Sequence, residues 1–142
     1  MNLNQVTLPA RDVRECASFY RGLGLTLIVD SCPQYARLEC PIGGATISLH
    51  HTDSVPGSPG ATIYFEVDDV DSTVERLTHM GLRFDHAPVD QPWLWREARL
   101  RDPSGNVVCL YHAGDYRRHP PWRVGEKELN SKLREALHAP NR

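Results

Sequence analysis

The sequence contains one structural pattern twice, and this duplication constrains the fold more strongly than any other feature. The first matches lie about 57 residues apart, and the later ones about 61 to 62 residues apart. The matching segments are Asp12-Val13 with Asp69-Val70, Gly24-Leu25 with Gly81-Leu82, Arg37-Leu38 with Arg99-Leu100, and Ile47-Ser48-Leu49 with Val108-Cys109-Leu110. A single repeat of this size cannot bury a hydrophobic core by itself. We therefore expect the two copies to pack against each other or to pair with copies in a second chain.

Each copy has the pattern of a strand, a helix and further strands. Period-two alternation predicts the strands, and apolar stripes that end near a glycine predict the helices. In the first copy we expect strands over 3–9, 25–29, 35–40 and 45–50, and a helix that begins after the N-cap Asp12 and ends at Gly24. In the second copy we expect strands over 61–67, 83–85, 93–101 and 107–111, and a helix that ends at Gly81. The two modules thus span about 3–53 and 61–113, with the Pro- and Gly-rich segment 54–60 as their linker.

The composition is typical of one globular domain in the cytoplasm. The 142 residues are 40% hydrophobic, which suffices for a packed core, and the formal net charge is −2. Neither this charge nor any motif indicates nucleic-acid binding. The apolar stretches are shorter than the ~20 residues of a membrane span, and 1–8 lacks the pattern of a signal peptide. The four cysteines have no CxxC spacing, so we expect reduced thiols.

Strand alternation divides each expected sheet into two faces. The apolar face should lie under the helix, because each helix has one stripe to bury. The opposite face then holds Gln5, Thr7, Thr46, Ser48, His50, Thr62, Tyr64, Glu66, Val107, Cys109 and Tyr111. This mixture of hydroxyl, aromatic and charged groups suits the lining of a ligand cavity. The alternative is an ordinary sheet surface that faces water.

Several motifs, taken together with the duplication, resemble the vicinal oxygen chelate superfamily. They are Gln5-Val6-x-Leu8, Phe19-Tyr20-x-x-Leu23-Gly24-Leu25, Phe65-x-Val67-Asp68-Asp69-Val70-Asp71 and Asp102-Pro103-x-Gly105-Asn106. That superfamily contains glyoxalase I, extradiol dioxygenases and bleomycin-resistance proteins, and Pro92-Trp93-x-x-Arg96-Glu97 is most similar to the bleomycin-resistance-like branch. The resemblance implies an α+β fold over 1–114, with two βαβββ modules that form a cup-shaped mixed sheet. It also implies a homodimer.

Metal-dependent members of this superfamily place His, Glu or Gln ligands at four positions of the cup. Those positions correspond here to Gln5, Ser48, Thr62 and Cys109. Gln5 alone among them is a residue type that the superfamily uses as a ligand, and hydroxyls are weak ligands for a divalent ion. We therefore expect no metal cofactor. The alternative is a displaced site that combines Gln5 with His50 or Glu66.

Without a metal, catalysis would depend on acid and base groups. Glu66 is the candidate base, His50 the complementary acid and Tyr64 a hydrogen-bond donor to an anionic oxygen, a role that Tyr111 could share. The candidate ligand-binding residues are Gln5, Thr7, Ser48, Thr62, Trp93, Trp95, Arg96, Cys109 and Tyr111. Within this set the tryptophans could stack on a flat ligand, and Arg96 or Arg99 could bind an anion.

Three classes of function are compatible with these residues. The first is a metal-independent isomerase, lyase or cyclase that acts on a carbonyl or aromatic metabolite. The second is a protein that sequesters a drug or metabolite without turnover, as the bleomycin-resistance resemblance implies. The third is a structural or regulatory module that binds no small molecule. A metal-dependent glyoxalase or dioxygenase is a further alternative to the first.

Residues 115–142 form a tail beyond the duplicated region. The prolines at 120 and 121 exclude a helix over 117–123, whereas 126–138 carries a one-sided stripe of leucines that predicts a short amphipathic helix. A helix of about 13 residues is marginal in water, so we expect it to dock on the core or on a partner subunit. The alternative is a lid over the cavity, with Trp122 as its anchor.

Overall fold

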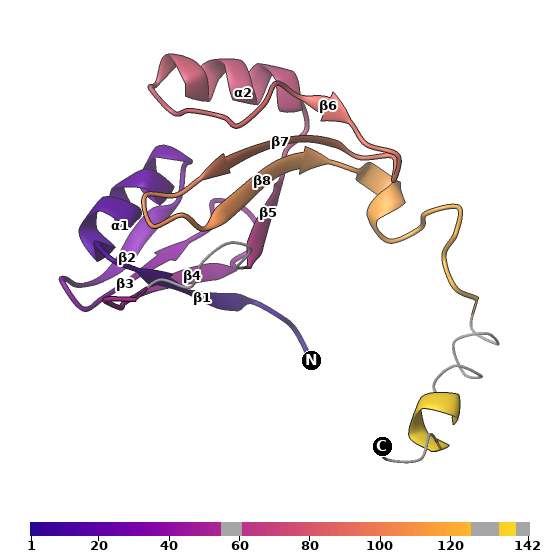
Figure 1. The fold of residues 1–142 in the computed structure, drawn as a ribbon, viewed down its shortest axis with the longest axis horizontal. Coiled ribbons are helices and arrows are strands. Elements are labelled where there is room, and N and C mark those ends of the chain that lie inside the picture. The colour runs from indigo at the N-terminus through magenta and orange to yellow at the C-terminus, as the bar shows by residue number, and fades with distance from the viewer. Residues whose placement is uncertain (55–60, 126–133, 139–142) are drawn as a thin grey trace. The chain divides into compact units, whose positions relative to one another are not determined.

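A computed structural model of the chain describes residues 1–54, 61–125 and 134–138. The chain divides into two units, Met1–His112 and Ala113–Arg142. The first unit contains two four-stranded sheets, which we call sheet A and sheet B, and one helix accompanies each (Figure 1). The fold is therefore α+β.

The two sheets have the same strand order. Sheet A contains β1 (Gln5–Ala10), β4 (Thr46–His51), β3 (Tyr35–Glu39) and β2 (Thr26–Ser31), in that spatial order. Sheet B contains β5 (Thr62–Glu66), β8 (Val107–His112), β7 (Arg96–Arg101) and β6 (Val89–Asp90). β1 pairs in parallel with β4, and β5 pairs in parallel with β8. The other strand pairs are antiparallel. The duplication in the sequence is thus a duplication of topology.

The two helices also begin and end in the same way. α1 (Val13–Gly22) and α2 (Val70–His79) each contain ten residues. The carboxylate of Asp12 accepts a hydrogen bond from the backbone of the third following residue at 2.9 Å, and Asp69 does so at 3.0 Å. These side chains satisfy backbone donors that a helix leaves unpaired at its N-terminus. Beyond the helix ends, Gly24 and Gly81 have φ angles of +107° and +98°, a conformation that strongly favours glycine.

One hydrophobic core joins the two modules. α1 packs on β3 and β4, and α2 packs on β7 and β8. The buried residues of the core are Leu8, Ala10, Val13, Cys16, Ala17, Tyr20, Leu25, Ala36, Leu38, Ile47, Leu49, Leu77, Leu100, Val108 and Leu110. Most of them come from the two helices and from the helix-covered faces of both sheets, as the alternation predicted. The modules therefore pack together within one chain.

One of the predicted strands is absent, and another begins later than predicted. Residues 83–85 form no strand, although Phe84 makes an isolated bridge to Leu100, and the short edge strand is β6 instead. The strand expected from residue 93 begins at Arg96, because the preceding residues form a turn. In this turn the amide of Leu94 donates to the carbonyl of Gln91 at 3.0 Å, and Leu94 has a φ angle of +69°.

The second unit begins with a short 3-10 helix, η1 (Gly114–Arg117). Residues 134–138 are helical, whereas 126–133 of the predicted amphipathic helix, and 55–60 of the predicted linker, lie outside the described residues. Among the described residues, none of the helices combines the length and the apolar character needed to cross a membrane.

Candidate functional site

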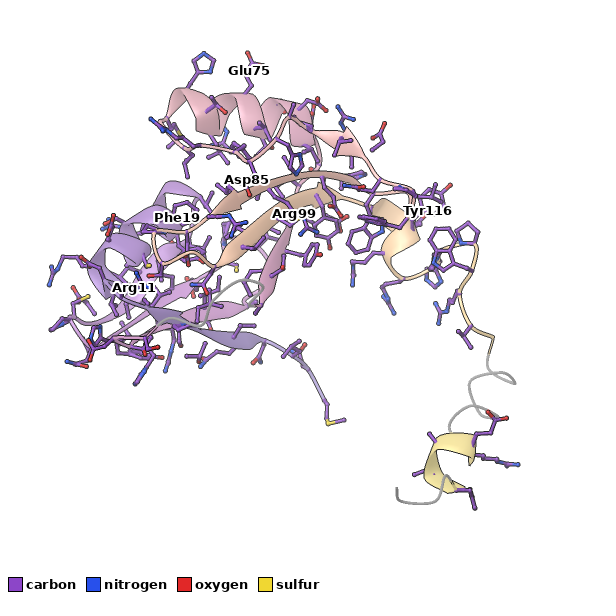
Figure 2. The ribbon with its side chains drawn as sticks, viewed as in Figure 1. Arg11, Phe19, Glu75, Asp85, Arg99 and Tyr116 are labelled. Atoms are coloured by element: carbon purple, nitrogen blue, oxygen red, sulfur yellow. The ribbon has the colours of Figure 1, made fainter. Side chains whose placement is uncertain are left out.

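Each sheet has a face that carries no helix, and we call it the helix-free face. The strand registers place Thr7, Ser48 and Arg37 side by side in sheet A, and Tyr64, Cys109 and Arg99 side by side in sheet B. Figure 2 shows Arg99 on the side of sheet B away from α2, whose outer side carries Glu75. The residues that alternation assigned to this face of each sheet therefore do share it.

Three aromatic side chains gather on the helix-free face of sheet B. The rings of Trp95 and Tyr111 are stacked, with centroids 4.7 Å apart and planes inclined by 23°. Tyr64 meets both rings edge-on, at 6.0 Å from Trp95 and 5.6 Å from Tyr111. Tyr111 is buried, whereas Tyr64 is 45% exposed. We call these three residues the aromatic cluster, and its exposed part offers a surface for stacking on a planar ligand.

Charged groups lie directly beside the aromatic cluster. Nη2 of Arg99 donates a hydrogen bond to Oη of Tyr64 at 3.3 Å and lies 3.6 Å from Oε2 of Glu97. Glu97 is only 1% exposed, and its Oε1 accepts a hydrogen bond from Nε1 of Trp93 at 2.9 Å. The face therefore combines aromatic surface with a partly exposed guanidinium and a buried carboxylate.

The helix-free face of sheet A carries a polar cluster instead. Oη of Tyr35 lies 2.6 Å from Oγ of the buried Ser48 and accepts a hydrogen bond from Nε of Arg37 at 2.9 Å. These two hydrogen bonds, that of Ser48 above all, lower the pKa of Tyr35 below its ordinary value. The phenolic oxygen is thus better able to exchange a proton than that of an isolated tyrosine.

The four positions that would hold a metal in the superfamily fit a divalent ion poorly. The side-chain carbonyl of Gln5 accepts a hydrogen bond from Thr46 at 3.0 Å, and Ser48 is held by Tyr35. Burial raises the pKa of Cys109 to about 12, and the other three positions offer no second soft ligand that would accompany its sulfur on a zinc ion. Within the described residues, no three His, Cys, Asp or Glu side chains gather closely enough to hold an ion.

The displaced metal site is not assembled within sheet A. Gln5 pairs with Thr46, whereas His50 pairs with Pro9 at the other end of the two strands. Four residues along a strand correspond to roughly 13 Å, which is too far for two ligands of one ion. The expected partner Glu66 lies on β5 of the other sheet. The structure therefore does not bring Gln5 together with His50.

The three candidate catalytic residues lie on two different sheets. Tyr64 and Glu66 are on β5, and Tyr64 belongs to the aromatic cluster. Glu66 also lines a cavity of about 280 Å³ that lies beside α2 and is bounded in part by Leu77. His50 is exposed on β4 of sheet A.

Arg96 is not the arginine that accompanies the aromatic cluster. It points to the opposite face of β7, where its guanidinium contacts Asp71 at 2.7 and 2.8 Å and Asp90 at 3.0 Å. This ion-pair network ties α2 to the edge of sheet B. Of the two arginines that the sequence left open as anion ligands, Arg99 is the one on the helix-free face.

The roles of Tyr35, Arg37 and Glu97 were not predicted from the sequence. A signal was present, because Arg37 and Arg99 are matched positions of the repeat. The residue two positions before each arginine must lie on the same face of its strand. Those residues are Tyr35 and Glu97.

Comparison with known proteins agrees with this architecture. A sequence model of the Glyoxalase/Bleomycin resistance protein/Dioxygenase superfamily matches residues 2–110. The chain belongs to this superfamily. An uncharacterized protein of Bacillus subtilis, YraH, is 27% identical over 127 residues, which cover 78% of this chain and 98% of YraH.

Two solved structures of the superfamily illustrate the shared fold. A glyoxalase/bleomycin resistance protein/dioxygenase from Nocardioides matches with a TM-score of 0.73 and 22% identity, over 88% of this chain and 90% of that one. A bleomycin-binding protein in complex with bleomycin matches with a TM-score of 0.65 and 21% identity, over 79% and 98% of the two chains. At these identities the likeness is one of fold.

Proposed function

We propose that this superfamily member binds a small aromatic molecule on the helix-free face of sheet B, without a resident divalent metal. The observation that carries the proposal is the aromatic cluster with Arg99 beside it. Tyr64 is about half-exposed and so leaves part of its ring in contact with water. A planar ligand that stacked on this cluster would cover that area.

The charge of the face favours a ligand with an anionic group or an oxygen acceptor. The side chain of Arg99 is 35% exposed and presents N–H donors next to the rings. Guanidinium groups hydrogen-bond carboxylates and other oxygen acceptors in a planar fork. The bleomycin-binding protein supports the proposal in one respect, since it holds a small molecule on the same fold.

A homodimer would extend this face into a groove. β1 and β5 are edge strands of their sheets, so each leaves one row of backbone groups for a further partner. Pairing with a second copy would use these edges and would place further side chains beside the aromatic cluster. We also assign the protein to the cytoplasm, in keeping with four cysteines that form no disulfides with one another.

Acid–base catalysis is the second candidate function, as an isomerase, lyase or cyclase on a carbonyl or aromatic compound. The observation in its favour is Tyr35, whose hydrogen bonds to Ser48 and Arg37 lower its pKa. A tyrosine in this state can transfer a proton to or from an oxygen of a bound substrate. Glu66, Tyr64 and His50 remain the other candidate groups.

Calorimetric titration with a matched pair of probes tests the binding proposal. The probes are 2-naphthoate and 2-naphthylmethylammonium, which share a ring system and differ in charge. We expect the wild-type protein to bind 2-naphthoate more tightly, Trp95→Leu to weaken both probes, and Arg99→Gln to weaken 2-naphthoate alone. Arg21→Gln on α1 is the control, because it removes the same charge away from sheet B. Equal binding of both probes to all variants would refute the proposal.

Mass spectrometry of the recovered ligand separates the two candidate functions. A sequestering protein returns the ligand unchanged after prolonged incubation, whereas an acid–base enzyme converts its substrate or exchanges the substrate's carbon-bound acidic protons with deuterated solvent. Deuterium exchange that Tyr35→Phe abolishes would favour the second candidate.

A further inference from the structure

One buried oxygen atom on the helix-free face of sheet B has an unmet hydrogen-bonding capacity. Oε2 of Glu97 accepts no hydrogen bond in the part of the chain that the structure describes, although the residue is only 1% exposed. Its nearest cation, Nη2 of Arg99, is 3.6 Å away and donates instead to Tyr64. Buried carboxylate oxygens are nearly always hydrogen-bonded, because burial without a partner is costly.

The first copy of the repeat shows that the fold itself does not require an unsatisfied oxygen at this position. Tyr35 occupies the position that Glu97 occupies in the second copy, two residues before the matched arginine. There the side-chain oxygen is satisfied twice, by Ser48 at 2.6 Å and by Arg37 at 2.9 Å. The same place in the topology can therefore be fully satisfied from within the module.

In the second copy both of these contacts are weaker. The residue that matches Ser48 is Cys109, whose thiol is a weak donor. Arg99 directs its Nη2 to Tyr64 of the aromatic cluster, at 3.3 Å, rather than to the carboxylate. As a result, an acceptor oxygen lies unused beside the surface on which we propose that a ligand stacks.

We propose that Oε2 of Glu97 accepts a hydrogen bond from a hydroxyl or N–H group of the aromatic ligand, which is therefore a phenol or an N–H-bearing heteroaromatic compound. This inference rests on the proposed binding function and specifies its ligand class. The second carboxylate oxygen is already fixed by Nε1 of Trp93 at 2.9 Å, so the free oxygen has a defined direction. Arg99, whose side chain is 35% exposed, lies 3.6 Å from this oxygen, so a ligand that reaches the oxygen also lies beside the guanidinium.

The test compares 2-naphthol with 2-methoxynaphthalene, which has the same ring system but no hydroxyl donor. Calorimetry on the full-length wild-type protein is expected to show tighter binding of 2-naphthol by about ten-fold or more, the size of a hydrogen bond to a charged acceptor. Glu97→Gln is expected to reduce this preference to within about two-fold while it leaves 2-methoxynaphthalene unaffected. Glu75→Gln on the outer side of α2 is the matched control and keeps the preference.

Thermal denaturation of the same variants supplies a second readout. Glu97→Gln replaces a buried carboxylate, one oxygen of which accepts no hydrogen bond, by a neutral amide that can still accept from Trp93, so we expect its melting temperature to match or exceed that of the wild type. A purely structural glutamate predicts the reverse, with a lower melting temperature and unchanged probe affinities. That reverse result would overturn the inference.

The outcomes also separate this inference from the proposed function. If the wild type binds both naphthalenes equally and Trp95→Leu weakens both, the stacking surface is real and the role of Glu97 is refuted. If neither naphthalene binds, the proposed function fails, and the inference fails with it. The comparison of the two probes on the wild type requires no variant to fold.

Discussion

Tyr20 on α1 donates a hydrogen bond of 2.8 Å from its phenolic oxygen to Oδ2 of Asp102, which lies 82 positions further along the chain. Both residues are buried, with 0% and 4% exposure. Asp102 begins the turn between β7 and β8, so this contact joins the helix of the first module to the hairpin of the second. It is a polar link within the core that the two modules share.

The same turn makes further contacts that hold it in shape. Oδ1 of Asp102 accepts hydrogen bonds from the backbone amides of Ser104 and Asn106, each at 2.9 Å. The side-chain amide of Asn106 donates to Oδ2 of Asp102 at 2.7 Å and to the carbonyl of Pro9 at 3.0 Å. The Asp-Pro-x-Gly-Asn motif therefore has a structural role, since its hydrogen bonds link one module to the other.

Loss of the tyrosine hydroxyl should destabilise the protein. Tyr20→Phe leaves Asp102 buried with one donor fewer, which costs on the order of 1–3 kcal/mol in the free energy of unfolding. Urea denaturation followed by circular dichroism measures this change. Tyr64→Phe is the control, because a half-exposed tyrosine should shift the free energy by about 0.5 kcal/mol or less. Equal stabilities of the two variants would contradict the role given to Tyr20.

Stability should fall in alkaline solution. Burial raises the pKa of Cys16 from 9.0 to about 11, and that of Cys109 from 9.0 to about 12, in the folded protein. Because the unfolded chain releases these protons first, the contribution of the thiols is complete below pH 9 and is lost as pH rises through 11 to 12. Urea midpoints should therefore decrease from pH 8 to pH 11, with a smaller decrease for Cys109→Ala. An equal decrease in that variant would argue against the buried thiol.

The four cysteines should differ in reactivity. Cys32 and Cys40 are partly exposed, whereas Cys16 and Cys109 are buried; burial raises the pKa of all four thiols, and that of Cys16 and Cys109 to about 11 and about 12. Since the thiolate is the reactive form, alkylation at pH 8 should modify the first two quickly and the other two only after unfolding. Mass spectrometry of peptides from timed samples identifies the sites. Rapid modification of Cys109 in the native protein would show that the helix-free face is open to solvent there.

The two neighbouring arginines of β7 should have separable effects. Arg96→Gln breaks the contacts with Asp71 and Asp90, a partly exposed network, and should lower the urea midpoint only slightly without changing ligand affinity. Arg99→Gln should weaken the binding of 2-naphthoate and should also lower the urea midpoint, because it removes the cation nearest the buried carboxylate of Glu97. Calorimetry and urea denaturation of both variants decide this. A loss of affinity in Arg96→Gln would contradict the assignment of faces.

Much of the fold could be predicted from the sequence, because repetition and periodicity are local signals. The matched aspartates and glycines located both helices, and alternation placed Tyr64, Cys109 and Tyr111 on one face. The same rule could have selected Arg99 over Arg96, since Trp95 and Arg99 are an even number of residues apart. The prediction named both arginines as possible anion ligands and did not apply this rule to choose between them.

The remaining features depend on contacts between distant segments. The link between Tyr20 and Asp102 crosses the two modules, and neither residue type indicates its partner. His50 and Glu66 were paired as acid and base from their separate strands, yet those strands belong to different sheets. The unsatisfied oxygen of Glu97 could not be predicted either, because it depends on where the side chain of Arg99 points.

The most direct test of the account is a two-dimensional NMR titration of the indole N–H signals with 2-naphthoate. We predict that the signals of Trp93 and Trp95 shift in a saturable manner, because one belongs to the aromatic cluster and the other donates to Glu97 beside it. Trp95→Leu should remove one of these signals and weaken the response of the other. Indole signals that stay unchanged as 2-naphthoate saturates the protein would contradict binding on the helix-free face of sheet B.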